Sequence, residues 1–223
     1  MLAFNNDPQL KKDLLAEVEK HRLADAIIAR TYGDINDEVF RGCAVGCSIK
    51  SHCTLKNVQL KTNDHSVYPD IFGVPKQLAH LQDVIFEGLP FQRTLWPGKF
   101  WSAIHPGADL SNVWPKFAVW LLTDPQYGVI KFARECDKPL IQKISDLYEH
   151  GGTKREFSDA AAAAAAYAAA AYAAAYAAAA AAYAAAAAYA ANAAYAANAA
   201  NASTKTNAYI AQSEKLLDLL MSA

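Results

Sequence analysis

Residues 160–202 read AAAAAAAYAAAAYAAAYAAAAAAYAAAAAYAANAAYAANAANA, and this stretch, here called the alanine tract, decides the fold. Alanine fills 34 of its 43 positions. Alanine is the strongest helix former, because it loses no side-chain rotamers and hides no polar group. No glycine, proline or charged residue lies between Ala160 and Thr204. The tract therefore predicts a long helical element, with Ser158 or Asp159 as its N-cap.

The length of the tract limits how it can be arranged. A straight helix of this length spans roughly 65 Å, whereas a compact domain built from the preceding residues is only about 40 Å across. The tract must therefore project from the domain or turn back on itself. We expect a hairpin of two helices or a strong bend.

The tract has no charged face, although a single exposed helix needs one to stay in water. Its alanines let helix backbones approach closely, and Tyr172, Tyr176 and Tyr183 fall within roughly 40° of one another on a helix. These features predict tight helix packing, within the chain or between copies of it. A membrane span is the alternative, although alanine is nearly neutral for insertion and tyrosine prefers the interface.

The chain as a whole, 223 residues long, is expected to be all-α. A helical globular domain is expected over residues 1–152, where Gly151 and Gly152 break the pattern. Residues 153–223 then form an alanine-rich extension that closes with a docking helix. The apolar residues of that last helix are Tyr209, Ile210, Leu216, Leu217, Leu219 and Leu220.

Charge and cysteine content narrow the class of function. A formal net charge of -1 offers no basic excess to hold phosphates, so a nucleic-acid partner is not expected. The first ten residues have neither a basic segment nor an apolar core, so no secretory signal is expected. Cys43, Cys47, Cys53 and Cys136 are too few for a disulfide framework in a chain of this length. A cytoplasmic protein with reduced thiols fits best.

The first helix is predicted to begin at Asp7 and Pro8, an N-cap followed by a proline at the first helical position. It is expected to run for about 20 residues. Its apolar stripe is Leu10, Leu14, Val18, Leu23, Ile27 and Ile28.

Further helices are predicted downstream from the same spacing rules. One covers Pro75 to Leu89, with Leu78, Leu81 and Ile85 facing inward. Four tryptophans at helical spacings are expected to fill the core: Trp96, Trp101, Trp114 and Trp120.

The segment Gly42-Cys43-Ala44-Val45-Gly46-Cys47 is the most unusual part of the first half. On a helix, the pairs Gly42/Gly46 and Cys43/Cys47 form two adjacent ridges of small side chains. Glycine costs about 1 kcal/mol relative to alanine inside a helix, so two glycines need a reason. Close approach of another backbone is the simplest reason, and the alanine tract is the expected partner.

Several motifs together resemble an uncharacterised family found in bacterial and phage genomes. They are Gly42-Cys43-Ala44-Val45-Gly46-Cys47, Asp64-His65-Ser66, Gly73-Val74-Pro75, Ile85-Phe86-Glu87-Gly88-Leu89-Pro90 and Trp120-Leu121-Leu122. Members of that family end in alanine-rich, regularly punctuated helices, and their motifs carry no assigned chemistry. The tail separately resembles alanine-repeat helices in immunity proteins of toxin systems.

Two kinds of chemistry compete with a purely structural role for the cysteines. Cys43, Cys47, His52 and Cys53 could bind zinc, but their spacing lacks the Cys-x2-Cys knuckle, and no metal or cofactor is expected. Cys43 or Cys47 could instead serve as a catalytic nucleophile beside His65. No nucleotide-binding or hydrolase motif supports an enzyme.

Taken together, the sequence favours a non-catalytic interaction protein of the immunity-like or phage-encoded kind, with the alanine tract as a packing or oligomerisation element. Its expected partner is another protein or a second copy of the chain, and a small-molecule ligand is left open. Two alternatives are kept. One is a thiol- or metal-dependent enzyme or binder centred on Cys43, Cys47 and His65, and the other is a membrane-associated helical protein.

Overall fold

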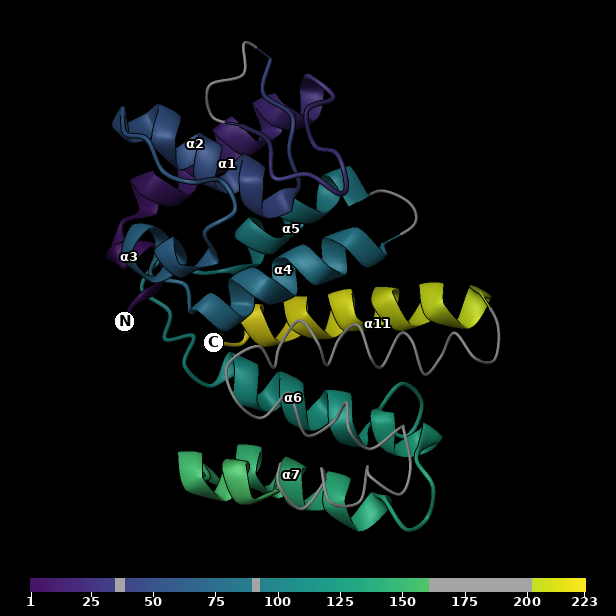
Figure 1. Ribbon diagram of the computed structural model, residues 1–223. Coiled ribbons are helices and arrows are strands. Elements are labelled where there is room, and N and C mark those ends of the chain that lie inside the picture. The colour runs from purple at the N-terminus through teal and green to yellow at the C-terminus, as the bar shows by residue number, and fades with distance from the viewer. Residues whose placement is uncertain (35–38, 90–92, 161–201) are drawn as a thin grey trace. The chain divides into compact units, whose positions relative to one another are not determined.

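The structure is a computed structural model that describes residues 1–34, 39–89, 93–160 and 202–223 (Figure 1). Helices dominate these residues, which contain no β-strand and only two isolated bridges, so the all-α prediction is confirmed. Residues 161–201 lie outside the described part. The predicted hairpin and the predicted packing face of Tyr172, Tyr176 and Tyr183 therefore also lie outside it.

The chain divides into two compact units. Unit 1 contains Met1–Asn112 together with the final segment Leu217–Ala223, and unit 2 contains Val113–Leu216. The boundary expected from the sequence, at residue 152, falls inside unit 2.

Helix α1 (Pro8–Leu23) begins where the sequence predicts. The carboxylate of Asp7 accepts hydrogen bonds from the backbone N–H groups of Gln9 and Leu10, as an N-cap does. The predicted extent was wrong, because the helix ends at Leu23 and Ile27 lies in an extended segment. That segment forms a parallel bridge with Gly42, so its backbone bonds go to another part of the chain.

Most of unit 1 is built from short helices around α2. They are α2 (Ala44–Lys56), α3 (Tyr68–Phe72), α4 (Lys76–Gly88), α5 (Trp96–Ala103) and the 3-10 turns η1 (Ala3–Asn6), η2 (His65–Val67) and η3 (Arg93–Leu95). Helix α2 packs against α1, α4 and α5. The three residues expected to face inward from α4, Leu78, Leu81 and Ile85, are fully buried.

The core of unit 1 is aromatic. Trp96 and Trp101 are buried as the spacing predicts, and Trp101 lies against Phe72 with ring centroids 4.6 Å apart. Trp114 and Trp120, which lie outside unit 1, are only half-buried, so for these two the prediction was wrong. The indole N–H of Trp101 donates to the Ser48 hydroxyl at 2.9 Å, and that of Trp96 donates to the Gln82 carbonyl at 2.8 Å. Each buried polar group of these two rings is therefore paired, as a dry core requires.

One surface lysine ties α1 to the end of α5. The amino group of Lys11 donates to the carbonyls of Ser102 and Ile104, at 2.8 and 2.7 Å. A cation at a helix C-terminus also interacts favourably with the helix dipole. Burial lowers the pKa of Lys11.

Unit 2 contains α6 (Val113–Thr123), the 3-10 turn η4 (Val129–Phe132) and α7 (Lys138–His150), and α6 packs against α7. Residues 154–160 are also helical. That helix begins earlier than predicted, because Thr153 and Glu156 form a capping box. The proposed N-caps Ser158 and Asp159 lie inside the helix, so that prediction was wrong.

The last helix, α11, covers Ala202–Met221 and carries buried Leu216 and Leu220. None of the helices in the described residues is both long enough and apolar enough to cross a membrane.

Candidate functional site

The glycine–cysteine segment forms the entry to α2. Gly42 is extended: its N–H donates to the Ala26 carbonyl, and its own carbonyl accepts from Ile28, each at 2.9 Å. Cys43 is the N-cap of α2, and its Sγ accepts a hydrogen bond from the Gly46 N–H at 3.5 Å. The expected helical ridges are therefore wrong, since Gly42 precedes the helix that holds Gly46.

Both glycines lie directly against the backbone of Tyr32. A Cβ atom added at Gly46 would lie 2.1 Å from the Tyr32 carbonyl oxygen, and one added at Gly42 would lie 2.7 Å from it. No side chain fits at these distances, which explains two glycines in six residues. The neighbour found here is the loop after α1, whereas the packing expected against the alanine tract concerns residues outside the described part.

Beside this loop, a buried carboxylate gathers several polar side chains. Asp83 of α4 accepts a hydrogen bond from the Tyr32 hydroxyl at 2.8 Å, through Oδ2. The same oxygen lies 3.3 Å from Nε2 of His65. The Cys43 thiol interacts with the same carboxylate. The chain thus brings together groups from the first loop, α2, η2 and α4.

A second histidine completes the cluster. His80, one turn before Asp83 on α4, stacks on His65 with ring centroids 4.2 Å apart and an interplanar angle of 11°. Tyr32 meets the same His65 ring edge-on at 5.7 Å. We call Tyr32, Cys43, His65, His80 and Asp83 the Asp83 cluster.

The electrostatics of the cluster keep Asp83 ionised and favour the neutral forms of Cys43, Tyr32 and His80. Burial alone would raise the pKa of Asp83, but hydrogen bonds from His65, Cys43 and Tyr32 outweigh it, and the pKa is lowered. Burial, with the Asp83 charge, raises the pKa values of Cys43 and Tyr32 well above their ordinary ranges. For His80, burial and then the neighbouring His65 lower the pKa to about 4.

The three catalytic candidates, Cys43, Cys47 and His65, lie in two different environments. Cys43 and His65 both meet Asp83, so the structure brings these two together. Cys47 instead donates its thiol hydrogen to backbone, to the Gly42 carbonyl at 3.3 Å. Burial raises the pKa of Cys47 to about 12. A nucleophilic cysteine needs a lowered pKa and access, and Cys43 is only 1% exposed.

The zinc candidates do not converge. His52 lies edge-on against Phe72 at 5.5 Å, and its Nδ1 has no hydrogen-bond partner within the described residues. Cys53 is buried near the end of α2. In the part of the chain that the structure describes, no three histidine, cysteine or acidic side chains are placed to hold a metal ion.

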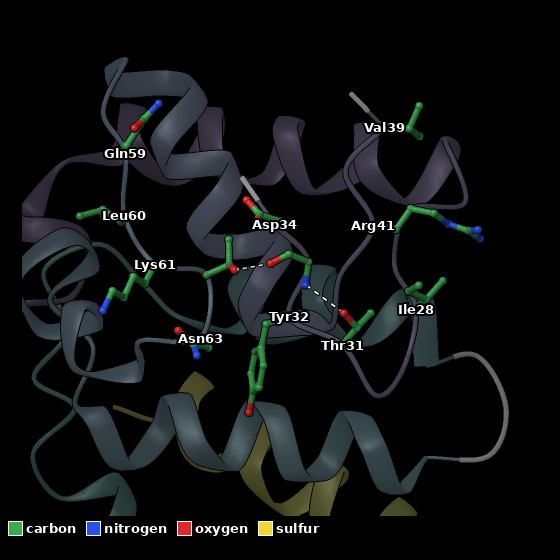
Figure 2. Close-up of a pocket in the computed structure, with 12 residues that line it drawn as sticks. Ile28, Thr31, Tyr32, Asp34, Val39, Arg41, Gln59, Leu60, Lys61 and Asn63 are labelled. Atoms are coloured by element: carbon green, nitrogen blue, oxygen red, sulfur yellow. Dashed lines mark hydrogen bonds between the residues drawn. The ribbon is translucent and has the colours of Figure 1, made fainter. Parts of the chain in front are cut away.

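A pocket of about 900 Å³ opens beside the cluster (Figure 2). One wall is formed by residue 28, residues 31–34 and residues 39 and 41, and the other by residues 59–63. The Thr62 hydroxyl joins the walls by donating to the Gly33 carbonyl at 2.6 Å. Figure 2 shows the Tyr32 hydroxyl pointing toward α4, so that the ring forms part of the wall while its polar tip is held by Asp83. The volume lies within the range of ligand pockets.

The chemistry of the pocket lining is mixed. Thr31, Gln59 and Asn63 offer hydroxyl and amide groups, and Arg41 and Lys61 supply exposed cations. Figure 2 shows Lys61 and Arg41 on opposite sides of the opening. Such a lining suits hydrogen bonding to an extended polar partner more than enclosure of an apolar small molecule.

Asp83, the residue on which the cluster depends, was not predicted from the sequence. A signal was present, because Gln82 and Asp83 interrupt a helix whose inward face is set by Leu78, Leu81 and Ile85. A buried charged residue is rare unless it is paired. The partner Tyr32 could not have been found this way, because it comes from a loop far away in the chain.

Comparisons of the chain with models of protein families, with curated proteins and with solved structures found no match.

Proposed function

We propose that this protein is a non-catalytic interaction protein that binds a protein partner through the pocket of unit 1. The observation that carries the proposal is the state of Cys43. This thiol lies beside an Asp–His pair, the arrangement a thiol enzyme would use, yet it is 1% exposed and its pKa is raised. Its hydrogen bonds support α2 and Asp83, so its role is structural.

The pocket supplies the binding face in this proposal. The Thr62 hydroxyl joins the two walls, and Asp83 holds the Tyr32 side chain of one wall in place, so their spacing is set before a partner arrives. Preorganised walls reduce the ordering cost of binding. Amide and hydroxyl groups between two flanking cations match the polar surface of a polypeptide, and interfaces of this kind carry many polar contacts.

Thiol alkylation of the native protein tests the non-catalytic part. Iodoacetamide at neutral pH should modify exposed Cys136 and leave Cys43 and Cys47 intact until the protein is unfolded, as read by peptide mass mapping. Cys136 is therefore a control within the same chain. Modification of Cys43 faster than Cys136 would overturn the proposal and favour the thiol enzyme.

Site-specific crosslinking tests the binding part. A photo-crosslinking residue placed at Gln59, in the pocket wall, should give one discrete protein adduct in cells. The same residue at Thr54, which is exposed on α2 outside the pocket lining, should not give that adduct. If the Gln59 variant gave no adduct, and light scattering showed a monomer, the interaction proposal would fail.

A further inference from the structure

One wall of the pocket contains an extended piece of backbone. Residues 58–61 follow α2 without helix, turn or bend. Figure 2 shows Gln59, Leu60 and Lys61 succeeding one another along that wall. In an extended segment, alternate residues present their N–H and C=O groups to opposite edges. The segment therefore has an inner edge, formed by Val58 and Leu60, and an outer edge, formed by Gln59 and Lys61.

Helix α2 satisfies the inner edge. The N–H of Val58 donates to the Cys53 carbonyl at 3.1 Å, and the backbone of Leu60 interacts with the Cys53 thiol. Cys53 is buried, so these contacts fix the segment against the body of unit 1. The position of the outer edge is thus set before any partner arrives.

The outer edge is exposed and unpaired. Within the described residues, neither the N–H and C=O groups of Gln59 nor the N–H of Lys61 forms a backbone hydrogen bond. The Lys61 carbonyl accepts from the Asp64 N–H at 3.1 Å, which closes the edge at that end. The free groups therefore follow the order donor, acceptor, donor. An extended edge with unpaired groups is a template for a further strand.

The facing wall already uses its main-chain groups for other contacts. The Thr31 carbonyl accepts from the Cys43 N–H at 2.6 Å, and the Gly33 carbonyl accepts from the Thr62 hydroxyl at the same distance. A strand that enters the pocket therefore finds its main-chain partners on the wall formed by residues 59–61.

The charge of that wall selects the chemistry of the strand. Residues 59–63 include Lys61 and no acidic side chain. The exposed amino group of Lys61 forms no ion pair with the described residues. Asp34, an acidic residue of the facing wall, is already engaged in a contact of its own. A carboxylate on the entering strand would therefore complement Lys61.

We propose that residues 59–61 bind a segment of the protein partner by strand addition, and that this segment carries a carboxylate opposite Lys61. The inference rests on the proposed function, because it names the part of the partner that enters the same pocket. In an antiparallel pairing, the partner residue opposite Gln59 exchanges two main-chain hydrogen bonds with it. The carbonyl of the partner residue opposite Lys61 accepts a third. The side chain of that residue lies on the same face as Lys61, where opposite charges attract.

NMR titration of the full chain with synthetic peptides tests the proposal. The probe is a capped peptide of about eight alternating threonine and glutamate residues, a usual strand length. The amides of Gln59 and Lys61 should shift, while those of α6 and α7 should not. At low salt, replacing every glutamate by glutamine should weaken binding about threefold, and replacing it by lysine about tenfold.

Two N-methylated forms of the glutamate peptide separate main-chain pairing from charge. The N–H groups of its glutamates face residues 59–61 when their side chains face Lys61. Methylation of the glutamate nitrogens should therefore weaken binding at least about tenfold. Methylation of the threonine nitrogens alters the opposite edge and should weaken binding less than about threefold. Equal weakening by the two forms would overturn strand addition.

A charge reversal tests the role of Lys61. Lys61→Glu should bind the lysine peptide more tightly than the glutamate peptide. Lys56→Glu, at an exposed position of α2 outside the pocket lining, should keep the natural order. An unchanged order in Lys61→Glu would reject the carboxylate.

Two further results would overturn the inference as a whole. One is that no peptide shifts the amides of Gln59 and Lys61. The other is that these amides shift with protein concentration alone, which would assign the edge to a second copy of the chain. The crosslinking experiment does not depend on strand geometry. An adduct at Gln59 without peptide binding would therefore reject strand addition and leave the proposed function standing.

Discussion

Replacing Gly46 with alanine sets two physical effects against each other. Gly46 is the third residue of α2, and alanine at a helical position is favoured over glycine by about 0.5–1 kcal/mol. Propensity alone therefore predicts a more stable protein. The structure predicts the opposite, because the new methyl group has no space.

The steric clash at Gly46 costs more free energy than the gain in helix propensity supplies. A Cβ at Gly46 would lie 2.1 Å from the Tyr32 carbonyl oxygen and 2.9 Å from its carbonyl carbon. These are backbone atoms, so no side chain can swing away, and either the loop or α2 must shift. Overpacking of this kind costs about 1–3 kcal/mol. A contact as short as 2.1 Å with backbone atoms belongs in the upper part of that range, about 2–3 kcal/mol. After a propensity gain of about 1 kcal/mol is subtracted, Gly46→Ala should lower the free energy of unfolding by about 1–2 kcal/mol.

A matched control is available on α5. Gly98 is also the third residue of its helix, and a Cβ there would meet nothing within 4 Å. Gly98→Ala should therefore stabilise the protein by about 0.5–1 kcal/mol. The two variants make the same chemical change at the same helical position, so their difference isolates the contact with Tyr32.

Urea unfolding, followed by tryptophan fluorescence and by circular dichroism, measures both variants. Thermal scans should show a midpoint change of about 2–4 °C for each kcal/mol in a chain of this size. The reasoning would be refuted if Gly46→Ala were as stable as the natural sequence or more stable. It would also be refuted if both glycine variants moved in the same direction.

Three further predictions concern the edges of the helices and the effect of pH. Lys11→Met should lose about 1–2 kcal/mol in urea unfolding, because the carbonyls at the end of α5 lose a charged donor, whereas Lys12→Met, a neighbouring exposed lysine, should be neutral. Thr153→Ala should cost the local helix about 1 kcal/mol and speed amide exchange at Glu156; unchanged exchange would show that this cap is absent in solution. Because the pKa of His80 is lowered from 6.5 to about 4 on folding, the unfolded chain binds more protons between these values. The free energy of unfolding should therefore fall as the pH drops through this window, and a flat profile in urea titrations would contradict the assignment.

Local rules predicted most of the helix positions. Asp7 and Pro8 mark the start of α1 because capping depends on neighbouring residues alone. The end of α1 was missed for the opposite reason. Ile27 continues the apolar stripe, but its backbone forms a parallel bridge with Gly42. Such tertiary pairing overrides the helical pattern of the side chains. The Thr153 cap was missed although its signal, a threonine three residues before Glu156, is local.

The candidate site was only half visible in the sequence. Cys43 and His65 were named for the chemistry their side chains can do, and the structure does place them on a common carboxylate. Asp83 carries no local motif, and its partner Tyr32 lies 51 residues away along the chain. The residue types in the sequence could suggest a nucleophile. Only the burial of Cys43 in the folded chain indicates that its thiol stays protonated.

The sequence by itself determined that this protein is built from helices, because helix propensity, capping and apolar spacing act over a few neighbouring residues. It also determined that residues 42–46 needed a close neighbour, because two glycines in such a place require one. Only the tertiary structure decided that the neighbour in the described residues is Tyr32, and that a charged aspartate lies beneath a pocket. Long-range contacts depend on how the whole chain closes on itself, and no single stretch of sequence contains that information.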